Sequence, residues 1–202
     1  AGFWSIDPVY FAERFRDFLV VISIIYFIYL LFFAGLTANE KKNVLMLLLL
    51  FIGAAAFWSG FDQSAGSLTI FTRDYVNLTF GTFTAPVSWT QFVNPLFVVM
   101  FAPFFAYLWV FLGKRNLDPN MPIKFGLGLI LMALGFIVMI LAVKYALASS
   151  PVGVQWLLLT YLLHTFGELT LSPVGLSAFS KYSPKRYLGQ MMGIWFLASS
   201  LG

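Results

Sequence analysis

The 202-residue sequence has few charges, because only 10% of its residues are Asp, Glu, Lys or Arg. A soluble domain has about 25%. With 60% hydrophobic residues, the chain cannot cover a globule with polar side chains, which excludes a soluble enzyme. The sequence has no cysteine, which excludes disulfides, thiolate metal sites and cysteine nucleophiles. It has a single histidine, which excludes a metal site built from several histidines.

Long apolar runs fill the sequence instead. A helix needs about 20 mostly apolar residues to cross a bilayer. Five runs qualify: Phe18 to Leu36, Val44 to about Phe71, Phe92 to Gly113, Ile123 to about Val143, and Val154 to about Ser180. A sixth run, Leu188 to Gly202, reaches only roughly 22 Å as a helix, which is too short to cross. The sequence therefore predicts an all-α transmembrane protein, and we interpret the chain as an internal piece of a longer one, truncated at both ends.

The basic residues of the connections form two unequal sets that alternate along the chain. One set holds four residues: Arg14, Arg16, Arg73 and Lys144. The other holds eight: Lys41, Lys42, Lys114, Arg115, Lys124, Lys181, Lys185 and Arg186. The positive-inside rule places the larger set in the cytoplasm. The basic loops are thus explained by membrane topology, and nucleic-acid binding is not predicted.

Two carboxylates lie inside predicted spans, Asp62 and Glu168. An intramembrane acid is costly unless it is hydrated, paired or protonated, which makes it a functional candidate. Glu168 lies roughly 21 Å along its span from the outer end, near the midplane where transporters place substrate sites. Asp62 lies roughly 27 Å from the inner end of its span, close to the outer mouth. A structural ion pair or a protonated, hydrogen-bonded acid remains the alternative for each.

Polar and aromatic residues accompany both acids. Trp58 is spaced i, i+4 with Asp62, and Ser172 has the same spacing from Glu168, so each pair shares a helix face. Pro173 removes a backbone donor, so we expect a kink beside Glu168.

Three further residues have more than one interpretation. His164 lies one turn before Glu168, and a core histidine with satisfied hydrogen bonds is the favoured interpretation. Asn94, beside Pro95 at the start of a charge-free span, either faces a cavity or caps the helix. Trp195 is either a pocket wall or an interfacial anchor.

Four segments resemble helices of the proton-coupled oligopeptide transporters. Phe57 to Gln63 resembles the seventh helix, and Gln91 to Phe97 resembles the eighth. Gly167 to Ser177 resembles the tenth, with an acid, a serine, a proline and glycines in register. Leu188 to Trp195 resembles the start of the eleventh. The resemblance covers nearly the whole chain and implies the major facilitator superfamily fold.

The resemblance also implies a domain organisation. The bacterial members carry two extra helices between the halves of the fold. Residues 1–36 would then be an inter-domain segment with one extra transmembrane helix. Residues 37–202 would be most of the C-terminal six-helix bundle, family helices seven to eleven with the last incomplete. The E-x-x-E-R motif of the family's first helix is absent, because it belongs to the missing N-terminal helix bundle.

By this resemblance the protein would be a symporter of the cell inner membrane that imports di- and tripeptides with protons, without a cofactor. Glu168 would bind the peptide's amino terminus, helped by Asn94. Side-chain pockets would be lined by Trp58, Ser172 and Trp195. Asp62 would pair with a basic residue of the first helix to close the outer gate, and Leu176 would be part of the inner gate.

Other functions stay open at this point. The same family contains carriers of nitrate and other small solutes, although a fixed carboxylate such as Glu168 repels an anion unless it is protonated. An intramembrane hydrolase would use His164, Glu168 and Ser172, which share one helix face. No oxyanion donors or second acid accompany them, which disfavours catalysis. A purely structural membrane scaffold would leave Glu168 unexplained.

Overall fold

The structure is a computed structural model that describes residues 8–149 and 151–201, and helices dominate it. The long helices are α1 (Pro8–Ile28), α2 (Ala38–Phe61), α4 (Val93–Lys114), α5 (Met121–Ser149) and α6 (Gln155–Tyr182). Two shorter helices are α3 (Ser67–Tyr75) and α7 (Leu188–Ser200). The predicted all-α class is confirmed. The first residues of the predicted inter-domain segment, 1–7, lie outside the described part of the chain.

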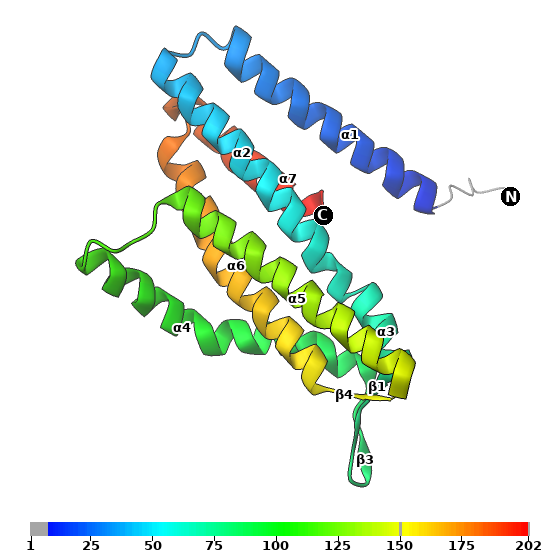
Figure 1. Ribbon diagram of the computed structural model, residues 1–202. Helices are drawn as coiled ribbons and strands as arrows, with labels where there is room; N and C mark the ends of the chain where they lie inside the picture. The colour runs from blue at the N-terminus through cyan, green and yellow to red at the C-terminus, as the bar shows by residue number, and fades with distance from the viewer. Residues whose placement is uncertain (1–7, 150, 202) are drawn as a thin grey trace, which may run out of the picture.

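Short elements join these helices. A π-helical turn, η1 (Tyr29–Phe33), extends α1, and three 3-10 turns follow: η2 (Asp62–Ser64), η3 (Val87–Phe92) and η4 (Lys185–Tyr187). Strand β1 (Val76–Asn77) pairs in parallel with β4 (Val152–Gly153). Strands β2 (Thr79–Phe80) and β3 (Phe83–Thr84) form a small hairpin, which projects from the lower end of the molecule in Figure 1.

Four helical segments of the described chain are long and apolar enough to cross a membrane: Tyr10–Phe33, Ala38–Tyr75, Val87–Lys114 and Met121–Ser149. They correspond to the first four predicted spans, although the first begins earlier than Phe18. The fifth prediction, Val154 to about Ser180, does form a helix, α6. Polar residues such as His164 and Glu168 lower its mean hydropathy, so α6 is not among the segments that qualify by composition.

The second predicted span is interrupted, which corrects its description as one continuous helix. Helix α2 ends at Phe61, η2 follows, and α3 begins at Ser67. Short polar side chains take over local hydrogen bonds here: Ser67 Oγ donates to Gln63 Oε1 at 2.7 Å, and Thr69 Oγ1 donates to the Ser64 carbonyl at 2.8 Å. The Thr69 hydroxyl occupies a carbonyl that a regular helix would pair with a backbone N–H, and Gly66, directly before α3, has non-helical dihedral angles (φ −98°, ψ −99°).

The start of α2 is fixed by a capping box. The Thr37 backbone N–H donates to Glu40 Oε2 at 2.9 Å, and the Glu40 N–H donates to Thr37 Oγ1 at 3.4 Å. Gly35, with φ of +62°, reverses the chain just before it. A positive φ of this kind favours glycine. This Gly-x-Thr-x-x-Glu pattern is a sequence signal that our sequence analysis did not use.

Helices α5 and α6 run side by side as the tightest pair of the structure (Figure 1). Glycines bring their backbones together. A Cβ atom on Gly128 of α5 would lie 2.8 Å from Leu171 Cβ and 3.0 Å from the Gly167 carbonyl oxygen of α6. Small residues at such positions allow close helix approach in membranes, where packing drives association.

We therefore predict that Gly128→Ala destabilises the protein by about 1–3 kcal/mol, because the new methyl group overpacks a backbone contact. Gly126→Ala is the matched control, since a Cβ atom at Gly126 on the same helix meets nothing within 4 Å. Thermal unfolding of both variants in detergent measures the difference. Equal melting temperatures for the two variants would contradict the close packing of α5 on α6.

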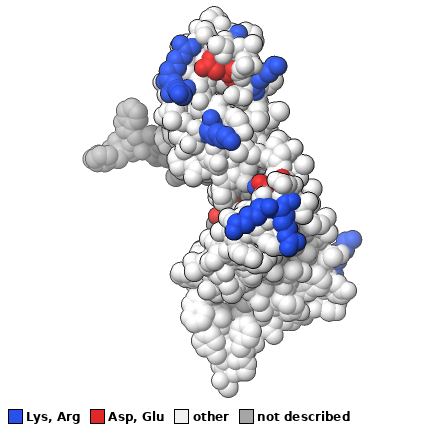
Figure 2. Space-filling model, turned by 90° about the vertical axis from the view of Figure 1, so that its left-hand side faces the viewer, with Lys and Arg blue, Asp and Glu red and all other residues white. Residues whose placement is uncertain are grey.

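The three connections that carry most of the basic residues lie at one end of the helices. They are the links α1–α2, α4–α5 and α6–α7 (Figure 1). Figure 2 faces this end and shows the lysines and arginines gathered on it, with a few acids between them. One acid, Asp118, forms an ion pair with Lys124 at 2.7 Å. The larger basic set thus occupies one side, as the topology prediction requires.

Helix α1 is fastened to the link between α6 and α7 by polar contacts, which we call the α1 clamp. Tyr26 Oη donates to Gln190 Oε1 at 3.0 Å, and the hydroxyls of Tyr29 and Tyr187 are 3.4 Å apart. The Arg186 guanidinium also donates to the Ala34 carbonyl. These contacts join residues more than 150 positions apart in the sequence. They attach α1 to the rest of the bundle at its basic end.

Candidate functional site

Glu168 and Asn94 meet between α6 and α4. Asn94 Nδ2 donates to Glu168 Oε2 at 3.3 Å and to Thr165 Oγ1 at 3.0 Å. Both Asn94 and Glu168 are half-buried. Asn94 makes no cap hydrogen bond to the start of α4, so of its two interpretations the capping one is wrong. Its side chain instead reaches across to α6.

Thr165 completes this group, and sequence analysis missed it. Its hydroxyl accepts the Asn94 bond and donates to the Tyr161 carbonyl at 2.7 Å, one turn back on α6. The side chain is fully buried. Its spacing of three residues before Glu168 is the signal that would have found it, because residues at i and i+3 share a helix face.

Aromatic packing sets the distance between α4 and α6 near this group. The ring of Phe166 lies 5.0 Å from that of Phe101 and 5.2 Å from that of Phe105, measured between centroids. Edge-to-face and tilted arrangements at this separation are favourable for aromatic pairs. The rings hold the two helices at the separation that lets Asn94 reach Glu168.

Ser172 and Leu176 follow Glu168 along α6 towards the basic end. Ser172 is half-buried, and Leu176 is 41% exposed. Helix α6 continues without interruption through Pro173, so the kink expected there stays a prediction. The exposed position of Leu176 leaves it accessible to another part of the protein. The roles of Ser172 as a pocket residue and of Leu176 as an inner gate also remain predictions.

Trp58 lies on the last turn of α2, and Asp62 directly follows the helix as the first residue of η2. Trp58 is half-buried and packs edge-on against Phe57 and Phe61, with centroids 5.6 Å and 5.2 Å away. Asp62 is exposed, and no ion pair within the described ranges includes it. The carboxylate therefore points away from the packed interior, at the position where the helix breaks.

Trp195 lies in the core of the α6–α7 interface, only 5% exposed. Its ring is 5.3 Å from that of Phe179, and a Cβ atom on Gly175 would lie 2.1 Å from it. The interpretation of Trp195 as an interfacial anchor is therefore wrong. Contact with a bound peptide would require α7 to move, and the pocket role stays a prediction.

His164 occupies a core position, as expected, with 1% of its surface exposed. The expectation that its hydrogen bonds are satisfied is wrong. Neither ring nitrogen has a hydrogen-bond partner within residues 8–149 and 151–201. The imidazole packs on Gly135 and lies 5.1 Å from the ring of Phe136, both on α5, whereas Glu168 contacts α4. Because the side chains of His164 and Glu168 face different helices, they do not form the nucleophile–base arrangement that a hydrolase needs.

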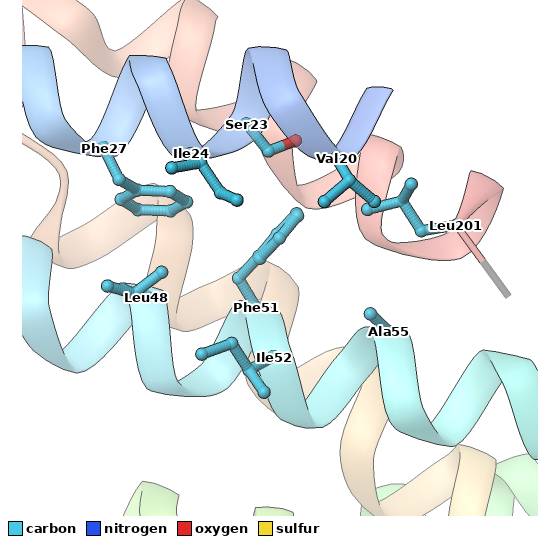
Figure 3. Close-up of a pocket in the computed structure, with 9 residues that line it drawn as sticks. All are labelled: Val20, Ser23, Ile24, Phe27, Leu48, Phe51, Ile52, Ala55 and Leu201. Atoms are coloured by element: carbon cyan, nitrogen blue, oxygen red, sulfur yellow. The ribbon is translucent and has the colours of Figure 1, made fainter. Parts of the chain in front are cut away.

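A pocket of about 400 Å³ lies elsewhere, between α1 and α2 (Figure 3). It is lined by Val20, Ser23, Ile24, Phe27, Leu48, Phe51, Ile52, Ala55 and Leu201. The hydroxyl of Ser23 donates to the carbonyl of Leu19 on its own helix at 2.7 Å, so its hydrogen is not free to bond to a ligand. A peptide site needs convergent polar groups. This apolar pocket does not provide them, and the Glu168–Asn94 group remains the candidate site.

The POT family model matches residues 7–202. The chain belongs to the POT family. It is 38% identical to the peptide transporter YePEPT of Yersinia enterocolitica, an alignment that covers 100% of this chain and 40% of that protein. It is 35% identical to the di-/tripeptide transporter of Lactococcus lactis subsp. cremoris, covering 98% of this chain and 42% of that protein. The chain thus spans about two fifths of the length of these POT relatives.

Solved structures of POT family members share the fold. A mutant of a peptide transporter POT in complex with alafosfalin matches with a TM-score of 0.86 and 36% identity, over 95% of this chain and 39% of that one. A POT family transporter in complex with 5-aminolevulinic acid matches with a TM-score of 0.88 and 30% identity, over 98% of this chain and 41% of that one. The fold is therefore part of a major facilitator superfamily transporter, and the chain is a multi-pass membrane segment.

Proposed function

We propose that the protein containing this chain imports di- and tripeptides together with protons, by alternating access. Residues 37–202 would supply the C-terminal half of the binding cavity, and residues 1–36 the inter-domain helix. The observation that carries the proposal is the Glu168 carboxylate, held by Asn94 at 3.3 Å between two neighbouring helices. The names of the relatives, peptide and di-/tripeptide transporters, support peptides as the cargo.

The geometry suits a peptide ammonium group. Asn94 uses its amide nitrogen for both of its bonds to α6, which leaves its carbonyl oxygen to accept a hydrogen bond. The second oxygen of Glu168 is likewise an acceptor. A desolvated carboxylate and an ammonium group form a strong charge-assisted hydrogen bond. The peptide's carboxylate would be held by basic residues of the N-terminal bundle, which lies outside this chain.

Asp62 suits a different role, in proton coupling at the outer gate. It is exposed at the end of α2, away from the Glu168–Asn94 group. Protonation of an acid that pairs across the two halves would weaken the closed outer side and shift the conformational equilibrium. No cofactor is needed, because the proton gradient across the inner membrane would drive accumulation.

The direct test is dipeptide uptake by the full-length protein in proteoliposomes. An inward proton gradient should drive accumulation of a labelled dipeptide above its outside concentration, and unlabelled dipeptide should compete whereas nitrate should not. Uptake that nitrate suppresses, or dipeptide that emerges cleaved, would contradict the proposal.

We also predict that residues 1–202 alone do not transport. Alternating access requires two halves that move against each other around one site. This chain provides at most one of them. Proteoliposomes containing only this segment should show dipeptide uptake no faster than empty liposomes, and specific uptake would contradict the assignment of this chain to one half.

A further inference from the structure

The apolar pocket between α1 and α2 has the chemistry of a hydrocarbon site. Its volume of about 400 Å³ lies within the range of roughly 300–1,000 Å³ that is usual for small-molecule pockets. Among its lining residues only Ser23 carries a polar side chain, and that hydroxyl bonds to Leu19 of the same helix. A polar ligand would lose its hydrogen bonds to water here without gaining new ones. The pocket therefore suits an alkyl chain.

The pocket has an aromatic base and an aliphatic mouth. Phe27 and Phe51 form the base, where their ring centroids are 5.5 Å apart and both side chains are buried. Figure 3 shows the two rings pointing from α1 and α2 into the space between the helices. Ile24 and Ile52 stand at the mouth, 53% and 55% exposed. Because both helices are apolar enough to cross a membrane, this mouth opens to the hydrocarbon of the bilayer.

A lysine lies on the pocket's face of α2, towards the basic end of the molecule. Lys41 precedes Leu48 by seven residues and Ala55 by fourteen, spacings that return to one face of an α-helix. Leu45, which is 51% exposed, lies on this face between Lys41 and the pocket. An apolar track with a cation at its cytoplasmic end thus runs along α2.

The charge of Lys41 is available to a ligand. The side chain is exposed, and no ion pair among the described residues includes it. The neighbouring acid, Glu40, accepts hydrogen bonds from the backbone N–H and the hydroxyl of Thr37, both at 2.9 Å. Arg186, which donates to the Ala34 carbonyl, brings a second cation to this end of the helices. An anionic group near Lys41 would therefore meet net positive charge.

The length of this track matches half of a bilayer. The fourteen residues from Lys41 to Ala55 span roughly 21 Å of helix. Half of a bilayer, with its headgroups, measures about 20–22 Å. A phospholipid whose phosphate lies at Lys41 would thus place the end of its acyl chain beside Ala55. The lysine can reach the headgroup level, since its alkyl stem extends along apolar surface while its ammonium group stays in water.

We propose that the gap between α1 and α2 binds an anionic phospholipid of the cytoplasmic leaflet. One acyl chain fills the pocket, and Lys41 pairs with the phosphate. An anionic headgroup is favoured because a zwitterionic one brings its own ammonium group, which offsets the attraction to lysine. Leu201, just after α7, lies next to Val20 at the end of the pocket away from Phe27, which leaves the cytoplasmic end free for the chain (Figure 3). The site is independent of which solute the protein carries.

Photolabelling of the full-length protein tests this site. The probe is phosphatidylglycerol with a diazirine group in its acyl chain, present as a minor component of phosphatidylcholine vesicles. Irradiation should label Phe27 and Phe51, which are buried from bulk lipid. Phosphatidylcholine that carries the same diazirine should label them about fivefold less, since its ammonium group offsets about one basic contact.

Two pairs of variants test the two ends of the lipid. Lys41→Gln should lower labelling by phosphatidylglycerol about fivefold, to the level of phosphatidylcholine. Lys42→Gln is its matched control, because it removes the same charge from a face turned by about 100°, and labelling should stay within about twofold. Ile24→Trp places a larger side chain in the mouth and should reduce labelling by both probes. Ile25→Trp, at a similarly exposed residue outside the pocket, should not.

Three results would overturn the proposal. Equal losses in Lys41→Gln and Lys42→Gln would indicate diffuse attraction of the lipid to the basic end. Unchanged labelling in Ile24→Trp would place the acyl chain outside the pocket. A wild-type protein without label at Phe27 and Phe51 would indicate that another part of the full-length protein fills the space. Because Lys41 and Ile24 are both exposed, their substitution should not prevent folding. Dipeptide uptake tests the proposed function separately.

Discussion

Glu168→Gln is expected to weaken dipeptide binding to the full-length protein by roughly 10- to 150-fold. The substitution keeps the size of the side chain and its bond from Asn94, but it replaces a charge-assisted hydrogen bond to the peptide ammonium with a neutral one. A hydrogen bond to a charged group contributes about 1.5–3 kcal/mol, which corresponds to that range of dissociation constants.

Binding of an N-terminally unblocked dipeptide, followed by calorimetry or thermal stabilisation, measures this change. Thr170→Ala is the matched control: Thr170 is buried on the same helix, and its hydroxyl bonds only to its own helix at 2.7 Å. The dipeptide affinity of Thr170→Ala should stay within about twofold of the wild-type affinity. A wild-type affinity in Glu168→Gln would remove Glu168 from the peptide site. A dipeptide with an acetylated amino terminus should bind poorly to both proteins.

Asp62→Asn is expected to abolish most proton-driven accumulation while dipeptide exchange across the membrane continues. The amide cannot change charge, so a pair that holds the outer side shut can no longer be switched by a proton. Because Asp62 is exposed at the end of α2 and not part of the Glu168–Asn94 group, peptide contact should survive.

Accumulation under a proton gradient and counterflow without one separate the two effects. A reporter cysteine in the outer vestibule should also become more accessible to labelling. The control is Asp74→Asn, an acid on the same side that already pairs with its neighbour Arg73 at 2.7 Å. An equal fall in accumulation and exchange, without a change in labelling, would make Asp62 a structural residue.

Much of the site was predictable because its signals are local. A carboxylate in an apolar run is costly wherever the helix packs, so Glu168 could be identified from sequence alone. Asn94 was identifiable as a polar residue in a charge-free span, but its direction was not. The choice between capping α4 and reaching α6 depends on how the two helices pack, and the contacts of Asn94 with Thr165 at 3.0 Å and Glu168 at 3.3 Å decide it.

The sequence predictions that the structure corrects share a physical origin. Each depends on a contact between distant segments or on a side chain that competes for backbone hydrogen bonds within a turn. Trp195 is buried instead of being an interfacial anchor because Gly175 leaves room for its ring, and no local pattern couples these two positions. The nitrogens of His164 lack partners because the surface of α5 beside them offers Gly135 and Phe136. The break after Phe61 coincides with the bond from the Thr69 hydroxyl to the Ser64 carbonyl and with the non-helical backbone of Gly66, which hydropathy does not register.

The α1 clamp has a mechanical consequence for alternating access. Hydrogen bonds connect Tyr26, Tyr29 and Ala34 to residues 186–190, so the end of α1 is tied to the start of α7. If the two halves of the transporter rock against each other, α1 travels with the half that contains α7. We then expect the hinge between the halves to lie on the N-terminal side of Tyr26 and the loop from α1 to α2 to keep its conformation.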